Sequence, residues 1–200
     1  MPRRKSRGGL PSKAPETPLA VSTEPKFEAE SRQKLNDWFG VLYSELQRSA
    51  AFLKRSDANA TISTFTLVHE TWLKLAKSQS APPQSELHFK STAACVMRQI
   101  VRDAARRRIA DKRGGGSVFV TLDESIDVPV SSNQDLLRLD AALDTLAEMS
   151  PRQAKLVELR YFGRLENSEI EAVLGVGERT VERDWIAAKA WLKTEIRKTH

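Results

Sequence analysis

The chain has few of the residues from which metal sites and disulfide frameworks are built. Its 200 residues include one cysteine and three histidines. A single cysteine, Cys95, excludes an internal disulfide and fits a reducing cytoplasm. The histidines His69, His88 and His200 lie far apart in the sequence and have no cysteine or carboxylate neighbours at metal-ligand spacing. We therefore expect no bound metal and no cofactor.

Membrane-length apolar runs and phosphate-binding loops are also lacking. No apolar run approaches the ~20 residues that cross a bilayer, so we expect no contact with a membrane. The basic N-terminus is not followed by an apolar segment, unlike a secretory signal. Gly114-Gly115-Gly116 is followed by Ser-Val-Phe, not by the lysine of a P-loop. Together with the scattered histidines, these features argue against an enzyme.

Proline and charge divide the chain into segments. Five of the nine prolines lie in residues 1–25, so we predict a disordered basic tail over 1–27. Residues 98–113 carry seven basic side chains, whereas residues 114–150 carry seven acids and one base. The net charge of +6 therefore comes from separate basic blocks with an acidic stretch between them. Such a distribution suits a polyanionic partner that is contacted at more than one place.

Apolar residues recur at helical spacing and predict an all-α chain with two small helical domains, at 28–113 and 135–198. Between them, 114–134 begins with three glycines and predicts a flexible acidic linker. The long helix from Phe89 is expected to turn its apolar residues inward and its arginines outward. The other inward stripes are expected at Leu35, Trp38, Phe39, Leu42, Leu46 and Leu53, at Phe65, Val68, Trp72 and Leu75, and at Leu136, Leu139, Leu143 and Leu146.

Residues 163–198 have the pattern of two helices joined by a tight turn. Gly175 is expected to take the left-handed conformation that ends a helix, and Val181, Trp185, Ala188 and Leu192 to face the core. A helix also begins at Ser150-Pro151, where we expect the serine to cap it. Helix-turn-helix proteins place the second helix of such a pair in the DNA major groove. An αα-hairpin that only builds core has the same pattern, so this segment alone leaves both interpretations open.

Several further motifs occur in a defined order. They are Met97–Arg108, Lys112–Gly116, Leu122–Glu124, Leu139–Leu143, Pro151–Ala154, Val157–Gly163 and Thr180–Trp185. In these motifs, at these spacings, the chain resembles the extracytoplasmic-function (ECF) branch of the sigma-70 family of bacterial transcription initiation factors. The similarity covers about residues 33–195.

The resemblance implies that residues 28–113 are sigma region two. The helix Leu67–Leu75 would dock on the clamp coiled coil of core RNA polymerase, with His69, Glu70 and Lys74 on its polar face. The helix from Phe89 would bind the promoter −10 element, with a pocket for an extruded base in the loop 78–88. Its DNA-binding residues would be Arg98, Arg102, Arg106 and Arg107, since a planar guanidinium pairs bidentately with phosphates and base edges.

Residues 135–198 would be sigma region four, whose second helix contacts the −35 element. The residues implied are Arg179, Thr180, Glu182, Arg183, Ile186 and Lys189. Arg183 suits a guanine, Glu182 the amino group of a cytosine, and Ile186 a thymine methyl. The expected partners are core RNA polymerase and promoter DNA, and an anti-sigma factor remains open as a third.

The sequence departs from the family pattern at a few positions. Lys90 stands where the family usually has phenylalanine, Glu166 lies at a customary Leu-Ser helix start, and Gly177 replaces a serine before the recognition helix. Two other functions remain open: an autonomous helix-turn-helix regulator that binds an operator as a dimer, and a helical adaptor whose basic face binds an acidic protein. The autonomous regulator explains the C-terminal segment but leaves the basic helix at 89–113 and the acidic linker without a purpose.

Overall fold

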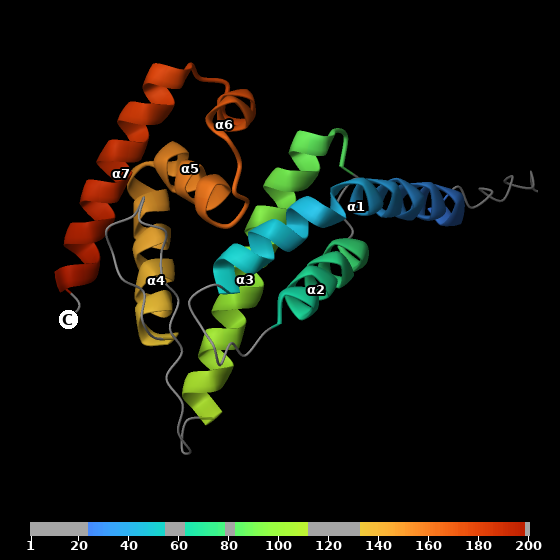
Figure 1. Ribbon diagram of the computed structural model, residues 1–200, viewed down its shortest axis with the longest axis horizontal. Helices are drawn as coiled ribbons and strands as arrows, with labels where there is room; N and C mark the ends of the chain where they lie inside the picture. Colours follow the sequence, from blue (N-terminus) through green and yellow to red (C-terminus); the bar gives the residue numbers. More distant parts are fainter. Residues whose placement is uncertain (1–23, 55–62, 79–82, 112–132, 199–200) are drawn as a thin grey trace, which may run out of the picture.

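The computed structural model describes residues 24–54, 63–78, 83–111 and 133–198, and every element in these ranges is a helix (Figure 1). The all-α prediction is therefore confirmed. The side chains before residue 32 and after residue 51 of the first helix lie outside the description, as does the predicted basic tail (1–27) up to residue 23. The predicted linker (114–134) lies outside it up to residue 132. Residues 24–27 of the predicted tail and 133–134 of the predicted linker belong to helices. The helices are α1 (Glu24–Lys54), α2 (Thr64–Lys77), α3 (Glu86–Asp111), α4 (Asn133–Met149), α5 (Pro151–Tyr161), α6 (Asn167–Leu174) and α7 (Glu178–Lys198).

Helices α1, α2 and α3 pack together around apolar side chains from each of them. Leu42 of α1, Val68 of α2 and Phe89 of α3 are all almost fully buried. The predicted inward stripe of α2 is wrong at Phe65, whose side chain is 65% exposed. Phe65 lies in the first turn of α2, on the side opposite to the buried Leu67 and Val68.

Helices α4 to α7 form the second group. The predicted leucine stripe of α4 is confirmed, because Leu136, Leu139, Leu143 and Leu146 are all buried. Helix α5 begins at Pro151 as expected, but the Ser150 side chain makes no capping hydrogen bond, so the serine-cap prediction is wrong. The missing N–H of proline leaves one donor fewer to satisfy at this helix start.

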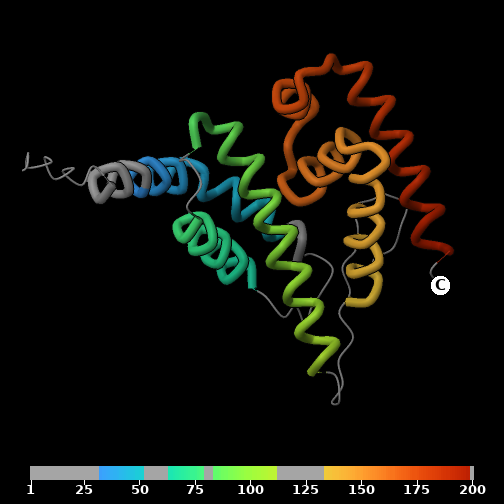
Figure 2. The backbone as a smooth tube through the Cα atoms, turned by 180° about the vertical axis from the view of Figure 1, so that it is seen from behind, coloured from blue at the N-terminus to red at the C-terminus, as the bar shows by residue number. Residues whose placement is uncertain are grey.

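The two groups pack directly against each other, with α3 between them (Figures 1 and 2). One apolar cluster continues from α1–α3 into α4–α7. The two groups approach closely at the turn after α5, where a Cβ added to Gly163 would lie 3.0 Å from Ala94 Cβ of α3. The Ser49 hydroxyl of α1 donates a hydrogen bond to the Gly163 carbonyl at 3.1 Å. In this conformation the helices of the two predicted domains share one core.

Candidate nucleic-acid and polymerase interfaces

The turn between α6 and α7 has the geometry of a helix-turn-helix. Gly175 adopts the predicted left-handed conformation, with φ 65° and ψ 34°, and its N–H donates to Glu171 O at 2.8 Å. At the start of α6, the Glu166 N–H donates to Glu169 Oε2 at 2.9 Å, so a side chain still caps this helix. Gly177 has no side chain to cap α7, and its carbonyl instead accepts from the Thr180 N–H at 2.9 Å.

Helix α7 has one face in the core and one face outside it. The predicted core residues are confirmed: Val181, Ala188 and Leu192 are fully buried, and Trp185 is 7% exposed. The residues implied for −35 binding lie outward: Arg179, Glu182, Arg183 and Ile186 are exposed, and Thr180 and Lys189 are half-buried. Ile186 is 66% exposed and is flanked by charged side chains. An isolated exposed apolar side chain on a charged face suits contact with a thymine methyl.

Two contacts fix α7 on α5. The Arg152 Nε donates to Asp184 Oδ2 at 2.6 Å, and the Asp184 side chain is 5% exposed. The Arg160 guanidinium lies 4.6 Å from the centroid of the Trp185 ring, and Lys189 Nζ lies 5.3 Å from it. Sequence reasoning missed Asp184, although an acid beside Trp185 on the inward face was a signal that it pairs with a base.

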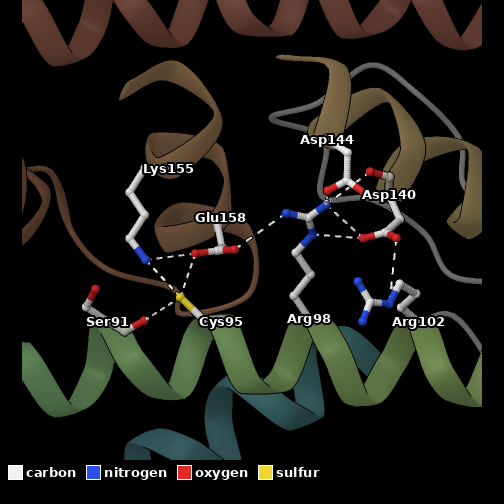
Figure 3. Close-up of polar contacts among 8 residues, drawn as sticks. All are labelled: Ser91, Cys95, Arg98, Arg102, Asp140, Asp144, Lys155 and Glu158. Carbon is white, nitrogen blue, oxygen red and sulfur yellow. Dashed lines mark hydrogen bonds and ion pairs between the residues drawn. The ribbon is translucent and has the colours of Figure 1, made fainter. Parts of the chain in front are cut away.

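The arginines of α3 differ in their exposure to solvent. Arg106 and Arg107 are exposed, as predicted. The prediction that all the arginines point outward is wrong for Arg98, whose side chain is 13% exposed. Arg102 is also partly covered, at 27%. Both lie on the side of α3 that faces α4 (Figure 3).

Arg98 is surrounded by carboxylates from α4 and α5 (Figure 3). Its Nε donates to Asp140 Oδ1 at 2.9 Å, and its Nη2 donates to Asp144 Oδ1 at 2.6 Å. Its Nη1 lies 3.6 Å from Glu158 Oε2, and Arg102 Nε lies 3.9 Å from Asp140 Oδ2. Asp140 and Glu158 are largely covered, with side chains 6% and 12% exposed. These ion pairs join the two helical groups.

Cys95 lies one turn before Arg98 in the same contact. Its thiol donates to Glu158 Oε1 at 2.8 Å and accepts from Lys155 Nζ at 2.9 Å. Burial raises the pKa of the Cys95 thiol, and the hydrogen bond to Glu158 raises it further against the opposing effect of Lys155. Burial would raise the pKa of Glu158, but hydrogen bonds from Cys95 and Lys155, with the charges of Lys155 and Arg98, lower it. The thiol is therefore protonated and the carboxylate ionised at neutral pH.

Lys90 makes a second connection between the groups. Its Nζ lies 2.6 Å from Glu45 of α1, 2.8 Å from Glu86 of α3 and 2.8 Å from Glu169 of α6. Burial would lower the pKa of Lys90, but hydrogen bonds to Glu169, Glu45 and Glu86 raise it. The same Glu169 that caps α6 with one carboxylate oxygen thus binds α3 with the other.

Helix α2 carries stacked rings, which run from the exposed Phe65 and His69 to the half-buried Trp72, whose Nε1–H donates to Asn36 Oδ1 of α1 at 3.2 Å. The ring centroids of Phe65 and His69 are 6.0 Å apart, and those of His69 and Trp72 are 6.2 Å apart. We call Phe65, His69 and Trp72 the α2 aromatic surface. Of the residues implied for polymerase binding, His69 is exposed and Glu70 half-buried. Lys74 is partly engaged within the chain, with Nζ 3.3 Å from Asp103 Oδ2 of α3.

Within the described ranges, no group of three or more His, Cys, Asp or Glu side chains could hold a metal ion. Nor is any described helix long and apolar enough to cross a membrane.

Comparison with known proteins identifies the family of the chain. A family model described as ECF sigma factor matches residues 29–198. No curated protein and no solved structure gives a match to this chain. The family match spans both helical groups, including α2, α3 and the helix-turn-helix. The chain belongs to the ECF sigma factors, which act in transcription initiation with RNA polymerase and promoter DNA.

Proposed function

We propose that this chain binds core RNA polymerase through α2 and directs initiation at promoters whose −35 element is contacted by α7 and whose −10 element is contacted by α3. The observation that carries the proposal is the outer face of α7. It projects charged side chains and one exposed isoleucine from a helix that Gly175 and Asp184 hold in a fixed orientation.

Recognition of the −35 element rests on the first half of α7. Arg183 has a side chain 73% exposed, and Glu182 and Ile186 are exposed beside it. A guanidinium, a carboxylate and an aliphatic group suit a guanine, a cytosine and a thymine respectively. Arg179, Thr180 and Lys189 supply further polar contacts to bases or phosphates.

Recognition of the −10 element rests on α3. Arg106 and Arg107 are accessible in the described conformation, and Arg98 and Arg102 complete a row of arginines along the helix. The chain has no nucleotide-binding loop, so the free energy for strand opening comes from binding to the separated strand.

Polymerase binding rests on the α2 aromatic surface together with Glu70 and Lys74. Phe65 is 65% exposed, and aromatic side chains are enriched where proteins bind each other. Exposed polar groups beside them provide the rim of such an interface.

A run-off transcription assay with purified core RNA polymerase tests the proposal. The full chain is incubated with core enzyme and a library of promoter fragments, and transcripts are sequenced. We expect initiation at a set of sites that share −35 and −10 sequences. Tight sequence-specific binding to duplex DNA without polymerase, and no transcript with it, would instead identify an autonomous regulator.

A further inference from the structure

Aromatic rings of α1 and α2 form one continuous row. The two helices lie side by side and run in opposite directions (Figure 1). The ring centroids of Phe39 and Tyr43 are 5.6 Å apart, and those of Phe39 and Trp72 are 6.2 Å apart. Trp72 continues the row into the α2 aromatic surface. We call these five residues the aromatic row: Tyr43, Phe39, Trp72, His69 and Phe65.

Every ring of the aromatic row keeps part of its surface in solvent. Phe39, Tyr43 and Trp72 are half-buried, and His69 and Phe65 are exposed. The His69 imidazole and the Tyr43 hydroxyl make no hydrogen bond within the part of the chain that the structure describes. Flat rings beside available donors suit a polyproline-II segment, because such a segment has no internal hydrogen bonds and its carbonyls accept from a binding surface.

We propose that the aromatic row is a docking surface for a polyproline-II segment, and that its occupant in the free chain is the N-terminal segment around Pro15-Glu16-Thr17-Pro18. The α2 part of the row is also the surface that we propose to bind polymerase, so the segment and the polymerase compete for it. The docking is independent of the proposed function, whereas the competition rests on it.

The N-terminal segment has the sequence pattern that aromatic-lined surfaces bind. Pro15 and Pro18 form a Pro-x-x-Pro motif. Since polyproline II has three residues per turn, Pro15, Pro18 and Val21 share one face of a segment in that conformation. That face is apolar. Proline also fixes its own φ angle, so the motif loses little conformational entropy when it docks.

The segment is long enough to reach the aromatic row. The distance along α1 from Glu24 to Phe39 is about 22 Å, and that to Tyr43 is about 29 Å, at the helical rise of 1.5 Å per residue. In polyproline-II conformation Pro18 is about 19 Å from Glu24, and Pro15 is about 28 Å from it. A chain that reverses direction just before α1 therefore brings Pro18 near Phe39 and Pro15 near Tyr43.

The spacing of the prolines also matches that of the rings on α2. Pro15 and Pro18 are about 9 Å apart in polyproline II. Phe65 and Trp72 are separated by about 10 Å along α2. Because α1 and α2 are antiparallel, the proline near Phe39 is also the one near Trp72, and the other lies near Phe65.

The neighbouring charges favour a basic peptide over a single-stranded nucleic acid. Bases also stack on aromatic rings, but nucleic-acid surfaces add basic side chains along the rings. Beside the aromatic row, Lys74 is paired with Asp103 of α3, and Glu70 and Asp37 supply negative charge. Residues 1–13 carry five basic side chains and no acid, so the N-terminal segment has the complementary sign.

Fluorine NMR of the full-length chain tests the docking at the aromatic row. The four tryptophans are replaced biosynthetically by 5-fluorotryptophan, and Trp72→Phe assigns the signal of Trp72. The test variant carries Pro15→Ala and Pro18→Ala. The matched control carries Pro2→Ala and Pro11→Ala, which removes two prolines of the same segment outside the motif. Circular dichroism establishes that each variant is folded.

We expect the Trp72 signal to move in the Pro15/Pro18 variant and to stay at its wild-type position in the Pro2/Pro11 control. The signals of Trp185 and Trp191, which lie on α7, should not move in either. Phe65→Leu keeps an apolar side chain but removes the flat ring. In a Phe65→Leu background, the Pro15/Pro18 change should therefore shift the Trp72 signal much less, as for two groups in contact.

A synthetic peptide of residues 8–23 supplies the segment as a separate molecule. Added to the Pro15/Pro18 variant, it should return the Trp72 signal toward the wild-type position, whereas the same peptide with both prolines replaced by alanine should not. The Pro15/Pro18 variant should also bind core RNA polymerase about twofold to tenfold more tightly than the wild type. This range corresponds to a free chain that is docked for about half to nine-tenths of the time.

Three outcomes would overturn the inference. The Trp72 signal could be the same in the wild type and the Pro15/Pro18 variant, so that the segment does not contact the row. The shift could persist unchanged in the Phe65→Leu background, which would place the contact elsewhere. A single-stranded oligonucleotide could move the Trp72 signal while the peptide left it in place, which would make the row a stacking surface for bases.

The measurements separate this inference from the proposed function. The Trp72 signal is recorded without polymerase or DNA. If it responds as expected but the chain yields no transcript with core polymerase, the docking stands and the proposed function fails. If the chain initiates transcription but the Trp72 signal ignores the proline changes, the function stands and the docking fails. An unchanged polymerase affinity beside a responsive Trp72 signal would refute the competition.

Discussion

Arg98 of α3 and Asp140 of α4 form an ion pair, with Arg98 Nη2 2.8 Å from Asp140 Oδ1, and both side chains are largely buried. The pair lies where the two helical groups of this ECF sigma factor meet. The helix that we propose to bind the −10 element and the helical group that we propose to contact the −35 element are thus held together by an ion pair.

Arg183→Ala should weaken binding to the −35 element. We expect a loss of about 1–3 kcal/mol at the cognate site and relaxed preference at one base pair, as for an arginine that contacts a guanine. Lys193→Ala, further along α7, is the control and should weaken binding slightly at every sequence. The measurement is competition binding of the holoenzyme to promoters with single substitutions in the −35 element. An unchanged base preference in Arg183→Ala would show that α7 is placed wrongly on the DNA.

Phe65→Ala should weaken binding to core RNA polymerase without loss of fold. Phe65 is 65% exposed, so its truncation removes little internal packing, but exposed aromatic anchors often contribute ~2 kcal/mol or more to an interface. Val41→Ala is the control, because Val41 is a 70% exposed apolar residue on α1. Affinity for core enzyme is measured by titration of labelled chain, and thermal unfolding shows that both variants are folded. If the two variants bound core enzyme with equal affinity, the α2 aromatic surface would not be part of the polymerase interface.

Gly163→Ala should destabilise the chain, whereas Gly40→Ala should stabilise it slightly. A Cβ at Gly163 would lie 2.7 Å from Leu159 O and 3.0 Å from Ala94 Cβ, so the turn after α5 must move away from α3. Overpacking of this kind costs about 1–3 kcal/mol. At Gly40, within α1, a Cβ meets nothing within 4 Å, and alanine should add about 0.4–1 kcal/mol. Urea unfolding of the two variants measures the difference, and an unaffected Gly163→Ala would mean that α3 and this turn do not approach closely in solution.

The free energy of unfolding should depend on pH through Glu158. Its pKa is lowered from the ordinary value of 4.5 in the folded chain, so its stabilising effect is complete above that value and is lost as pH falls through the depressed pKa. The stability difference between wild type and Glu158→Gln should therefore be constant near neutrality and shrink below about pH 4.5. Glu148→Gln, an exposed acid on α4, is the control and should show no such change. Urea unfolding across pH 3–7 provides the measurement, and a difference that did not shrink in acid would contradict the lowered pKa.

The helical class, the family and the two faces of α7 could all be predicted from the amino-acid sequence alone. Apolar spacing is a local property of the chain, and each helix buries the stripe that its own sequence presents. The left-handed conformation of Gly175 could also be predicted without tertiary information, because glycine is favoured at such a position at the end of any helix. The predicted core residues Val181, Trp185, Ala188 and Leu192 are accordingly buried.

The surroundings of the arginines of α3 depend on the tertiary structure. Helical spacing puts Arg98 and Arg102 off the apolar stripe, but it does not show whether their side chains face solvent or an acidic residue of another helix. Their partner Asp140 is 42 residues from Arg98 in sequence, and only the docking of α4 on α3 brings the two together. Phe65 shows the converse: it continues the apolar stripe of α2, yet its ring is exposed although Leu67 in the same turn is buried. Which side of a helix is buried depends on where the neighbouring helices lie, and that is set by packing between segments distant in the chain.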